Sequence, residues 1–225
     1  MTNRQRHRIR WPVARLVLPA LVLVGCSTGP VSPPSNPHNA CDMFDQYPHW
    51  LEAARKSEKK YGTPVPISMA FVYQESQFVA DNQPARNWIG FRPSTAYGYA
   101  QALDTTWNDY RRATGNSSAD REDFDDTMDF IGWYNSNASR RAGIASNDAY
   151  RLYLAYHEGV QGYQRGTYKN KKWLLNTASS VQQRAQRYQA QMNSCGVGGN
   201  RSGGGEAASQ TTDEDRQFWL EMMEQ

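Results

Sequence analysis

Residues 62–78 read Gly-Thr-Pro-Val-Pro-Ile-Ser-Met-Ala-Phe-Val-Tyr-Gln-Glu-Ser-Gln-Phe. This largely apolar stretch predicts a helix. Four of its residues are spaced four, four and three apart: Ile67, Phe71, Glu75 and Phe78. Side chains at this spacing share one side of an α-helix. The pattern therefore places a carboxylic acid, Glu75, on an apolar face.

A carboxylic acid on an apolar face loses contact with water. Loss of water penalises the ionised form, so we expect the pKa of Glu75 to be raised. A glutamate that keeps its proton near neutral pH can act as a general acid. The alternative is that Glu75 lies at the helix end, where it reaches solvent or pairs with Arg86.

The rest of the chain between residues 41 and 195 also carries a helical pattern. Apolar residues recur at spacings of three and four, which predicts a mainly α-helical domain. The expected helices cover residues 45–61, 66–78, 104–115, 124–134 and 146–159, and a longer one contains residues 181–192. Gly62 marks the end of the first helix and Pro66 the start of the second. Asp104 and Ser146 are the expected N-caps of two later helices.

Three short motifs follow one another along the predicted domain: Glu75-Ser76-Gln77-Phe78, Gly98-Tyr99-Ala100-Gln101 and Ala155-Tyr156-His157-Glu158-Gly159. Their order and separations resemble the motifs of the soluble lytic transglycosylases, in which the second is commonly Gly-Leu-Met-Gln and the third Ala-Tyr-Asn-Ala-Gly. The resemblance covers residues 47–188 and implies a lysozyme-like helical fold. His157 and Glu158 depart from the third motif, and the segment of residues 81–97 is longer than usual.

The resemblance implies an enzyme that cleaves the MurNAc-GlcNAc glycosidic bond in peptidoglycan glycan strands. Glu75 is implied to protonate the leaving oxygen and then to act as the base. The substrate's N-acetyl group shields the cationic centre, its 6-hydroxyl attacks, and a 1,6-anhydroMurNAc end forms. No cofactor is implied. A zinc site is also not expected, because His157 has no second histidine at metal-binding spacing.

The resemblance also implies substrate contacts around Glu75. Gln101 is expected to contact the N-acetyl sugar through an amide that donates and accepts hydrogen bonds; a solvated loop glutamine is the alternative. Tyr156 either packs in the core or also points its hydroxyl toward Glu75. Ser76 either orients the acid or caps the helix end. Tyr99 lies in an expected loop, where a flat ring suits a sugar.

Two other functions stay open at this point. A lysozyme-like muramidase hydrolyses the same bond and uses a second carboxylate to activate water, for which Glu158 and Asp81 are candidates. Glu158 and its neighbour His157 are also expected among the substrate-binding residues. The third possibility is a lipoprotein that binds the wall without cutting it.

The N-terminus reads as an export signal. Five arginines precede an apolar stretch, residues 16–25, which is too short to span a bilayer as a permanent helix. Leu23-Val24-Gly25-Cys26 resembles the lipobox of bacterial lipoproteins, which implies removal of residues 1–25 and acylation of Cys26. The mature protein is then expected to stay on a membrane of the cell envelope. Ser27 favours the outer membrane, facing the periplasm, by analogy with such lipoproteins.

The net positive charge of the chain, +3, comes from this signal. Removal of its five arginines from the 25 Lys and Arg leaves 20, against 22 Asp and Glu, which is a formal charge of −2. The mature chain therefore lacks the positive excess that phosphate contacts require, and no nucleic-acid partner is expected.

The three cysteines suggest one disulfide. If Cys26 is acylated, Cys41 and Cys195 remain as a pair in a compartment where disulfides persist. They bracket the predicted domain, residues 41–195. A Pro-rich tether is expected at residues 26–40, and a Gly-rich linker with a short acidic tail at residues 196–225.

Overall fold

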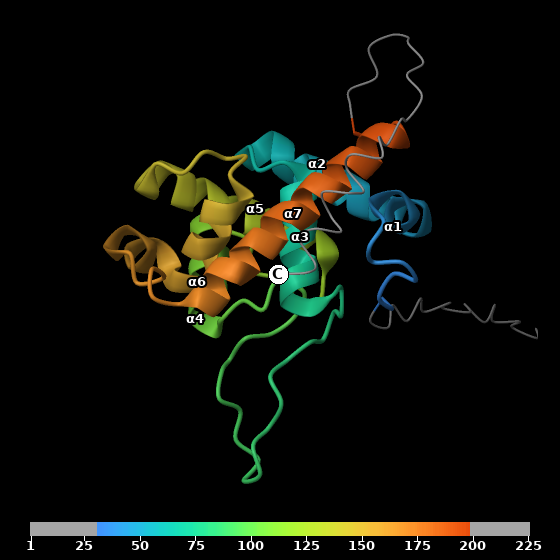
Figure 1. The fold of residues 1–225 in the computed structure, drawn as a ribbon. Helices are drawn as coiled ribbons and strands as arrows, with labels where there is room; N and C mark the ends of the chain where they lie inside the picture. The colour runs from blue at the N-terminus through green and yellow to red at the C-terminus, as the bar shows by residue number, and fades with distance from the viewer. Residues whose placement is uncertain (1–30, 199–225) are drawn as a thin grey trace, which may run out of the picture.

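The computed structural model describes residues 31–198, and within this range it is built from α-helices without β-strands (Figure 1). The helices are α1 (Ala40–Gln46), α2 (Pro48–Tyr61), α3 (Val65–Ser76), α4 (Asp104–Thr114), α5 (Phe124–Ala142), α6 (Ala149–Arg165) and α7 (Lys172–Ser194). The predicted mainly α-helical class is confirmed. The predicted signal peptide, Cys26 and the acidic tail lie outside the described residues.

The predicted helix over residues 45–61 is wrong in one respect, because the chain forms two helices there. The break falls at Tyr47, and Pro48 occupies the first turn of α2. Proline has no N–H to continue a helix and disfavours helical geometry in the residue before it. At the other end, Gly62 adopts a left-handed conformation with φ of 83°, as expected for a helix-ending glycine.

Two predicted N-caps are also wrong. Asp104 is the first residue of α4 itself, and the cap position falls on Leu103, which makes no side-chain cap bond. The cap of α6 is Asp148 rather than Ser146, because the Asp148 side chain accepts a hydrogen bond from the backbone N–H of Arg151. The helices nevertheless lie at the predicted places in the chain.

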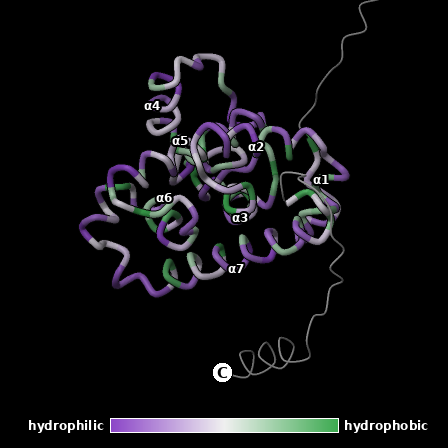
Figure 2. The backbone as a smooth tube through the Cα atoms, turned by 90° about the horizontal axis from the view of Figure 1, so that it is seen from above, coloured by the Kyte–Doolittle hydropathy of each residue, from purple (hydrophilic) through white to green (hydrophobic). Residues whose placement is uncertain are grey.

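Helix α3 lies at the centre of the fold, and Figure 2 shows it enclosed by α2, α5, α6 and α7. Every residue from Val65 to Val72 is buried. The predicted single apolar face is therefore too narrow a description, since this part of the helix packs on all sides. The helix ends at Ser76, before the predicted Phe78, because Gln77 turns left-handed with φ of 51°. Phe78 returns to the core and stacks on Trp50 at a ring separation of 5.4 Å.

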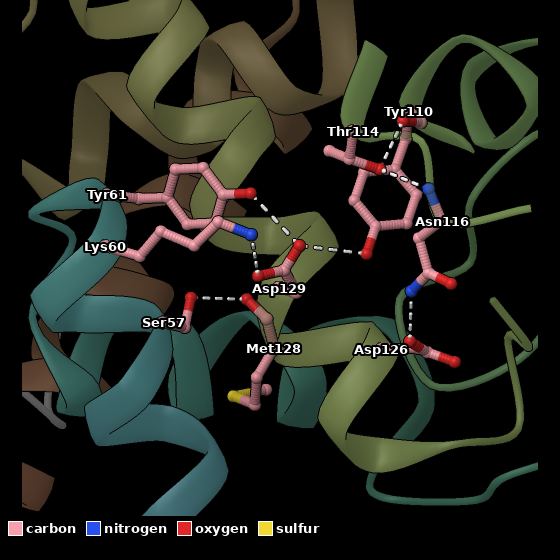
Figure 3. A network of polar contacts seen from close by, with 9 residues as sticks. All are labelled: Ser57, Lys60, Tyr61, Tyr110, Thr114, Asn116, Asp126, Met128 and Asp129. Carbon is pink, nitrogen blue, oxygen red and sulfur yellow. Dashed lines mark hydrogen bonds and ion pairs between the residues drawn. The ribbon is translucent and has the colours of Figure 1, made fainter. Parts of the chain in front are cut away.

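A partly buried polar network joins α2 to α4 and α5 (Figure 3). Asp129 on α5 accepts hydrogen bonds from Lys60 at 2.8 Å and from the hydroxyls of Tyr61 and Tyr110, each at 3.0 Å. Ser57 donates to the Met128 carbonyl at 2.6 Å. The pairing satisfies polar groups that helix packing would otherwise leave without water.

Part of the predicted tether packs against the domain instead of standing free. The hydroxyl of Tyr188 donates to the Pro37 carbonyl at 2.5 Å, and that of Tyr47 to the Ser32 carbonyl at 2.8 Å. The backbone N–H of Ala40 donates to the side chain of Gln191 at 2.9 Å. Backbone groups of this proline-rich segment thus find partners on α7 and at the junction of α1 and α2, which composition alone does not reveal.

The predicted disulfide is confirmed: Cys41 is bonded to Cys195, with a Cα–Cα distance of 6.3 Å across a separation of 154 residues. It ties the start of α1 to the end of α7. No helix within residues 31–198 combines the length and apolarity needed to cross a membrane.

Replacing Cys41 and Cys195 together by serine is expected to lower the free energy of unfolding by about 4 kcal/mol, because the bridge restricts the unfolded chain across a long loop. Urea unfolding of the oxidised wild type and the double variant measures this difference. Reduced wild type should match the variant. Equal midpoints for the oxidised wild type and the variant would contradict the prediction.

Candidate active site

Glu75 lies in the last turn of α3, where the central helix reaches the surface. Its side chain is partly exposed, while the residues that precede it in the helix core are buried. Burial raises the pKa of Glu75 from 4.5 to about 7, and a hydrogen bond from the Tyr153 hydroxyl acts in the opposite direction. The raised pKa agrees with the prediction from the sequence. At neutral pH this carboxyl group therefore exists in both protonated and ionised forms.

The hydroxyl of Tyr153 is a feature of the site that sequence reasoning missed. Tyr153 and Tyr156 are three residues apart on α6, and both rings pack edge-on against Phe71, with centroids 5.3 Å away. Burial raises the pKa of both tyrosines, and the negative charge of ionised Glu75 acts in the same direction. The three-residue spacing from Tyr156 was the available signal, because it puts both side chains on one helix face.

A chain of hydrogen bonds connects the end of α3 to the second motif. The side-chain amide of Asn82 donates to the Glu75 carbonyl at 3.2 Å, and the Asn82 carbonyl accepts from the Gln101 amide at 2.7 Å. Gln101 also donates to the Gly98 carbonyl at 2.9 Å. These bonds hold the loop after Glu75 against the segment that carries Gln101.

The third motif, on α6, bonds to the second motif. The hydroxyl of Tyr156 donates to the Ala100 carbonyl at 2.6 Å. The ring of Tyr156 packs on Phe71, as the core interpretation expects, and its hydroxyl is used by the Ala100 carbonyl. The structure thus brings all three motifs together, although residues 75 and 156 are far apart in the chain.

Gly98 is required by this arrangement for a steric reason. It has φ of 78°, and a Cβ atom at this position would lie 2.3 Å from the Arg121 carbonyl oxygen. A larger residue could not make this close approach. The glycine lets the second motif lie directly on the loop that precedes α5, which fixes the position of Gln101.

Gln101 keeps one hydrogen-bonding atom available. Its amide nitrogen is used by Asn82 and Gly98, but no donor within residues 31–198 bonds its Oε1 atom. Its backbone has φ of 47°, an uncommon conformation for a residue with a side chain. Gln101 is partly exposed. It therefore presents an amide oxygen from a fixed backbone position beside the end of α3.

Ser76 and Tyr99 take structural positions. The Ser76 hydroxyl is buried and donates to the Val72 carbonyl at 3.2 Å, which favours the helix-end interpretation over one in which it orients the acid. Tyr99 is fully buried against Trp50 and Phe124. The expectation that its ring faces a sugar is wrong for this structure, because the whole side chain points into the core.

The carboxylate of Glu158 forms an ion pair with Lys171. It accepts hydrogen bonds from Lys171 at 2.6 Å and from the Thr167 hydroxyl, and lies 3.0 Å from the His157 ring. Burial acts to raise the pKa of Glu158, but these contacts outweigh it and lower the pKa to about 2. A carboxylate this stable is a weak base, so Glu158 is poorly suited to activate water.

The remaining predicted residues make no contact with Glu75 among the hydrogen bonds, ion pairs and ring contacts of residues 31–198. His157 is exposed and packs edge-on against Trp173 at 5.0 Å. Asp81 is exposed at the start of the loop after α3. The predicted alternative partner of Glu75, Arg86, instead donates to the Gly90 carbonyl at 2.7 Å.

Comparison with known proteins gives one family. Residues 14–195 match the family described as Transglycosylase SLT domain, which is more than half of the chain and includes all three motifs. A search of curated proteins finds no match.

The raised pKa of Glu75 predicts a stability that depends on pH. The folded state binds this proton more tightly than the unfolded state, so stability is lost as the pH rises from 4.5 to about 7. The free energy of unfolding of Glu75→Gln should equal that of the wild type at about pH 4. At about pH 8 it should be larger by about 3 kcal/mol. Urea unfolding at both values measures this, with exposed Glu52→Gln on α2 as the control. Parallel pH profiles for the wild type and Glu75→Gln would contradict the prediction.

Tyr153→Phe removes the hydrogen bond that holds the pKa of Glu75 down. We expect the carboxyl group to titrate above about 7 in this variant, because its ionised form loses a donor. Carbon-13 NMR of the Glu75 carboxyl group follows the titration. Tyr163→Phe removes a hydroxyl from the same helix as a matched control and should leave the midpoint in place. A midpoint that stays at the wild-type value in Tyr153→Phe would show that this hydroxyl does not act on Glu75.

Proposed function

The chain belongs to the transglycosylase SLT domain family, and on this premise we propose that it is a peptidoglycan lytic transglycosylase with Glu75 as its acid and base. The family itself indicates an activity of the lytic transglycosylase type on peptidoglycan. The finer assignment rests on one observation above all. Glu75 reaches the surface from a buried helix with a pKa near 7, which suits a group that must give and then take a proton.

The proposed reaction needs a single carboxyl group. Protonated Glu75 gives its proton to the bridging oxygen, and the bond between this oxygen and C1 of MurNAc breaks. The ionised Glu75 then takes the proton of the 6-hydroxyl, whose oxygen forms a new bond to C1. No water is consumed, the product is a 1,6-anhydroMurNAc end, and Glu75 returns to its protonated form.

The neighbours of Glu75 support this cycle. The Tyr153 hydroxyl acts to lower the pKa of Glu75, so it stabilises the ionised form that appears after the first proton transfer. The free Oε1 atom of Gln101 can accept a hydrogen bond from the N–H of an N-acetyl group. This bond would hold a sugar beside the acid. Tyr156 fixes the backbone of the second motif through Ala100.

The muramidase alternative is weakened by the ion pair of Glu158. A hydrolase that activates water needs a second carboxylate that accepts a proton, and the pKa of Glu158 is lowered to about 2. Asp81 is exposed near the site and is the remaining candidate for that role. The two enzymes differ in their products, because hydrolysis leaves a reducing end in place of the anhydro ring.

We also propose a location in the cell envelope, where the substrate lies. The support is the sequence of the N-terminus, with its five arginines, its short apolar stretch and the lipobox-like residues that end at Cys26. Acylation of Cys26 would hold the domain at a membrane, and the outer membrane facing the periplasm is the proposed side. The disulfide of the domain fits an oxidising compartment.

Purified peptidoglycan digested with the wild-type protein should release muropeptides with 1,6-anhydroMurNAc ends, detected by mass spectrometry. Glu75→Gln should lower the rate by about a thousandfold, because the amide cannot donate a proton. Glu58→Gln is the matched control, since Glu58 on α2 is also partly buried with a raised pKa. It should leave the rate unchanged.

The products separate the three candidate functions. Reducing ends in place of anhydro ends would establish the muramidase and overturn the transglycosylase. Release of no product by the wild type, with binding to the wall that survives Glu75→Gln, would establish a binding lipoprotein.

A further inference from the structure

A loop between α3 and α4 projects from the body of helices (Figure 1). Its tip carries three large apolar side chains that are mostly in solvent: Trp88 is 95% exposed, Ile89 65% and Phe91 64%. An exposed apolar cluster of this kind marks a surface that contacts another molecule or a membrane. We call residues 86–92 the loop tip.

The loop tip has a defined backbone. The Asn87 N–H donates to the Phe91 carbonyl at 2.8 Å, and the Gly90 N–H donates to the Asn87 carbonyl at 2.9 Å. The Asn87 side chain also accepts from the N–H groups of Ile89 and Phe91. These bonds form a tight turn that presents the apolar side chains together. Little conformational freedom is therefore lost when the tip binds.

Two arginines, Arg86 and Arg92, flank the apolar residues in the sequence. Arg86 donates to the Gly90 carbonyl at 2.7 Å, and Arg92 donates to the Pro84 carbonyl across the loop. Each guanidinium keeps further N–H donors. Residues 82–96 contain no Asp or Glu, so this part of the loop has a formal charge of +2. The loop tip therefore carries both exposed apolar side chains and two cationic side chains.

We propose that the loop tip inserts into the surface of an anionic lipid bilayer. Tryptophan favours the boundary between headgroups and acyl chains, and arginine side chains remain at the headgroup level while neighbouring apolar groups enter. The two arginines complement anionic headgroups, which attract basic residues near a membrane. Trp88 and Ile89 lie outside the hollow that Arg86, Phe91 and Arg92 line with the legs of the loop, so these two exposed apolar side chains are free to enter a bilayer.

The insertion would set the distance between the proposed acid and the membrane. The loop begins a few residues after Glu75 and returns at Gln101, which bonds its first turn through Asn82. The outgoing leg, residues 82–88, has seven residues and spans at most about 25 Å. A tip in the bilayer thus holds the end of α3 within about this distance of the lipid surface. The contact does not depend on acylation of Cys26 and adds a second membrane signal to it.

Fluorescence quenching tests insertion directly in the whole chain. Vesicles of phosphatidylethanolamine and phosphatidylglycerol are prepared with and without bromine on the acyl chains. The emission that Trp88→Phe removes from the wild-type spectrum is the emission of Trp88. We expect brominated lipid to quench it by about half or more, because the indole lies at the acyl boundary. Trp173, which is 56% exposed at the start of α7, is the matched control and should not be quenched. Equal quenching of the two tryptophans, or none, would overturn the proposal.

Binding measurements identify the ligand. Trp88→Ser combined with Phe91→Ser should lower sedimentation with these vesicles by about tenfold or more relative to Trp173→Ser. Both variants retain the same N-terminus, so its contribution cancels. Neutral phosphatidylcholine vesicles should bind the wild type about tenfold more weakly than anionic ones. If the double variant instead loses binding to insoluble peptidoglycan and keeps its binding to vesicles, the loop tip is a glycan contact and the membrane proposal is wrong.

Discussion

The burial of α3 is the constraint on which the rest of the structure depends. The helix packs on all sides along its first two turns, and its last turn comes out of the core carrying Glu75. The hydrocarbon around that turn penalises a charge, which costs about 3 kcal/mol when the carboxyl group ionises in the folded protein. The same packing that stabilises the domain therefore raises the pKa of Glu75 to near neutrality. Fold and proposed chemistry share this single cause.

Backbone strain gathers around the same helix end. Within residues 31–198, three residues other than glycine have positive φ: Gln77, Phe78 and Gln101. Such conformations cost of order 1 kcal/mol or more each and persist where the surroundings determine them. Here Phe78 is held by its stack on Trp50, and Gln101 by its bonds to Asn82 and Gly98. The strained positions turn the chain sharply after Glu75 and return it to the end of α3, where bonds through Asn82 bring the first two motifs together.

The sequence predicted those parts of the molecule that depend on local pattern. The position and environment of Glu75 followed from spacing, and most helices followed from periodicity and from Gly62 and Pro66. What failed depends on contacts between distant segments. The inward direction of Tyr99 and the ion pair of Glu158 with Lys171 are set by packing that no single stretch encodes. Tyr153 was missed although its spacing from Tyr156 was visible, because an aromatic residue on a helix is more often explained as core.

Glu75 and Glu158 show why the surroundings of a carboxyl group decide its chemistry more than its burial does. The Glu158 side chain is only 4% exposed, yet its pKa is lowered to about 2 because Lys171, Thr167 and His157 stabilise the charge. Glu75 has one hydroxyl donor against the penalty of burial, and its pKa is raised to about 7. A group that gives and takes the same proton works best when neither form dominates. The balance at Glu75 therefore depends on how few donors surround it, and an added cation at this helix end would remove the property that burial creates.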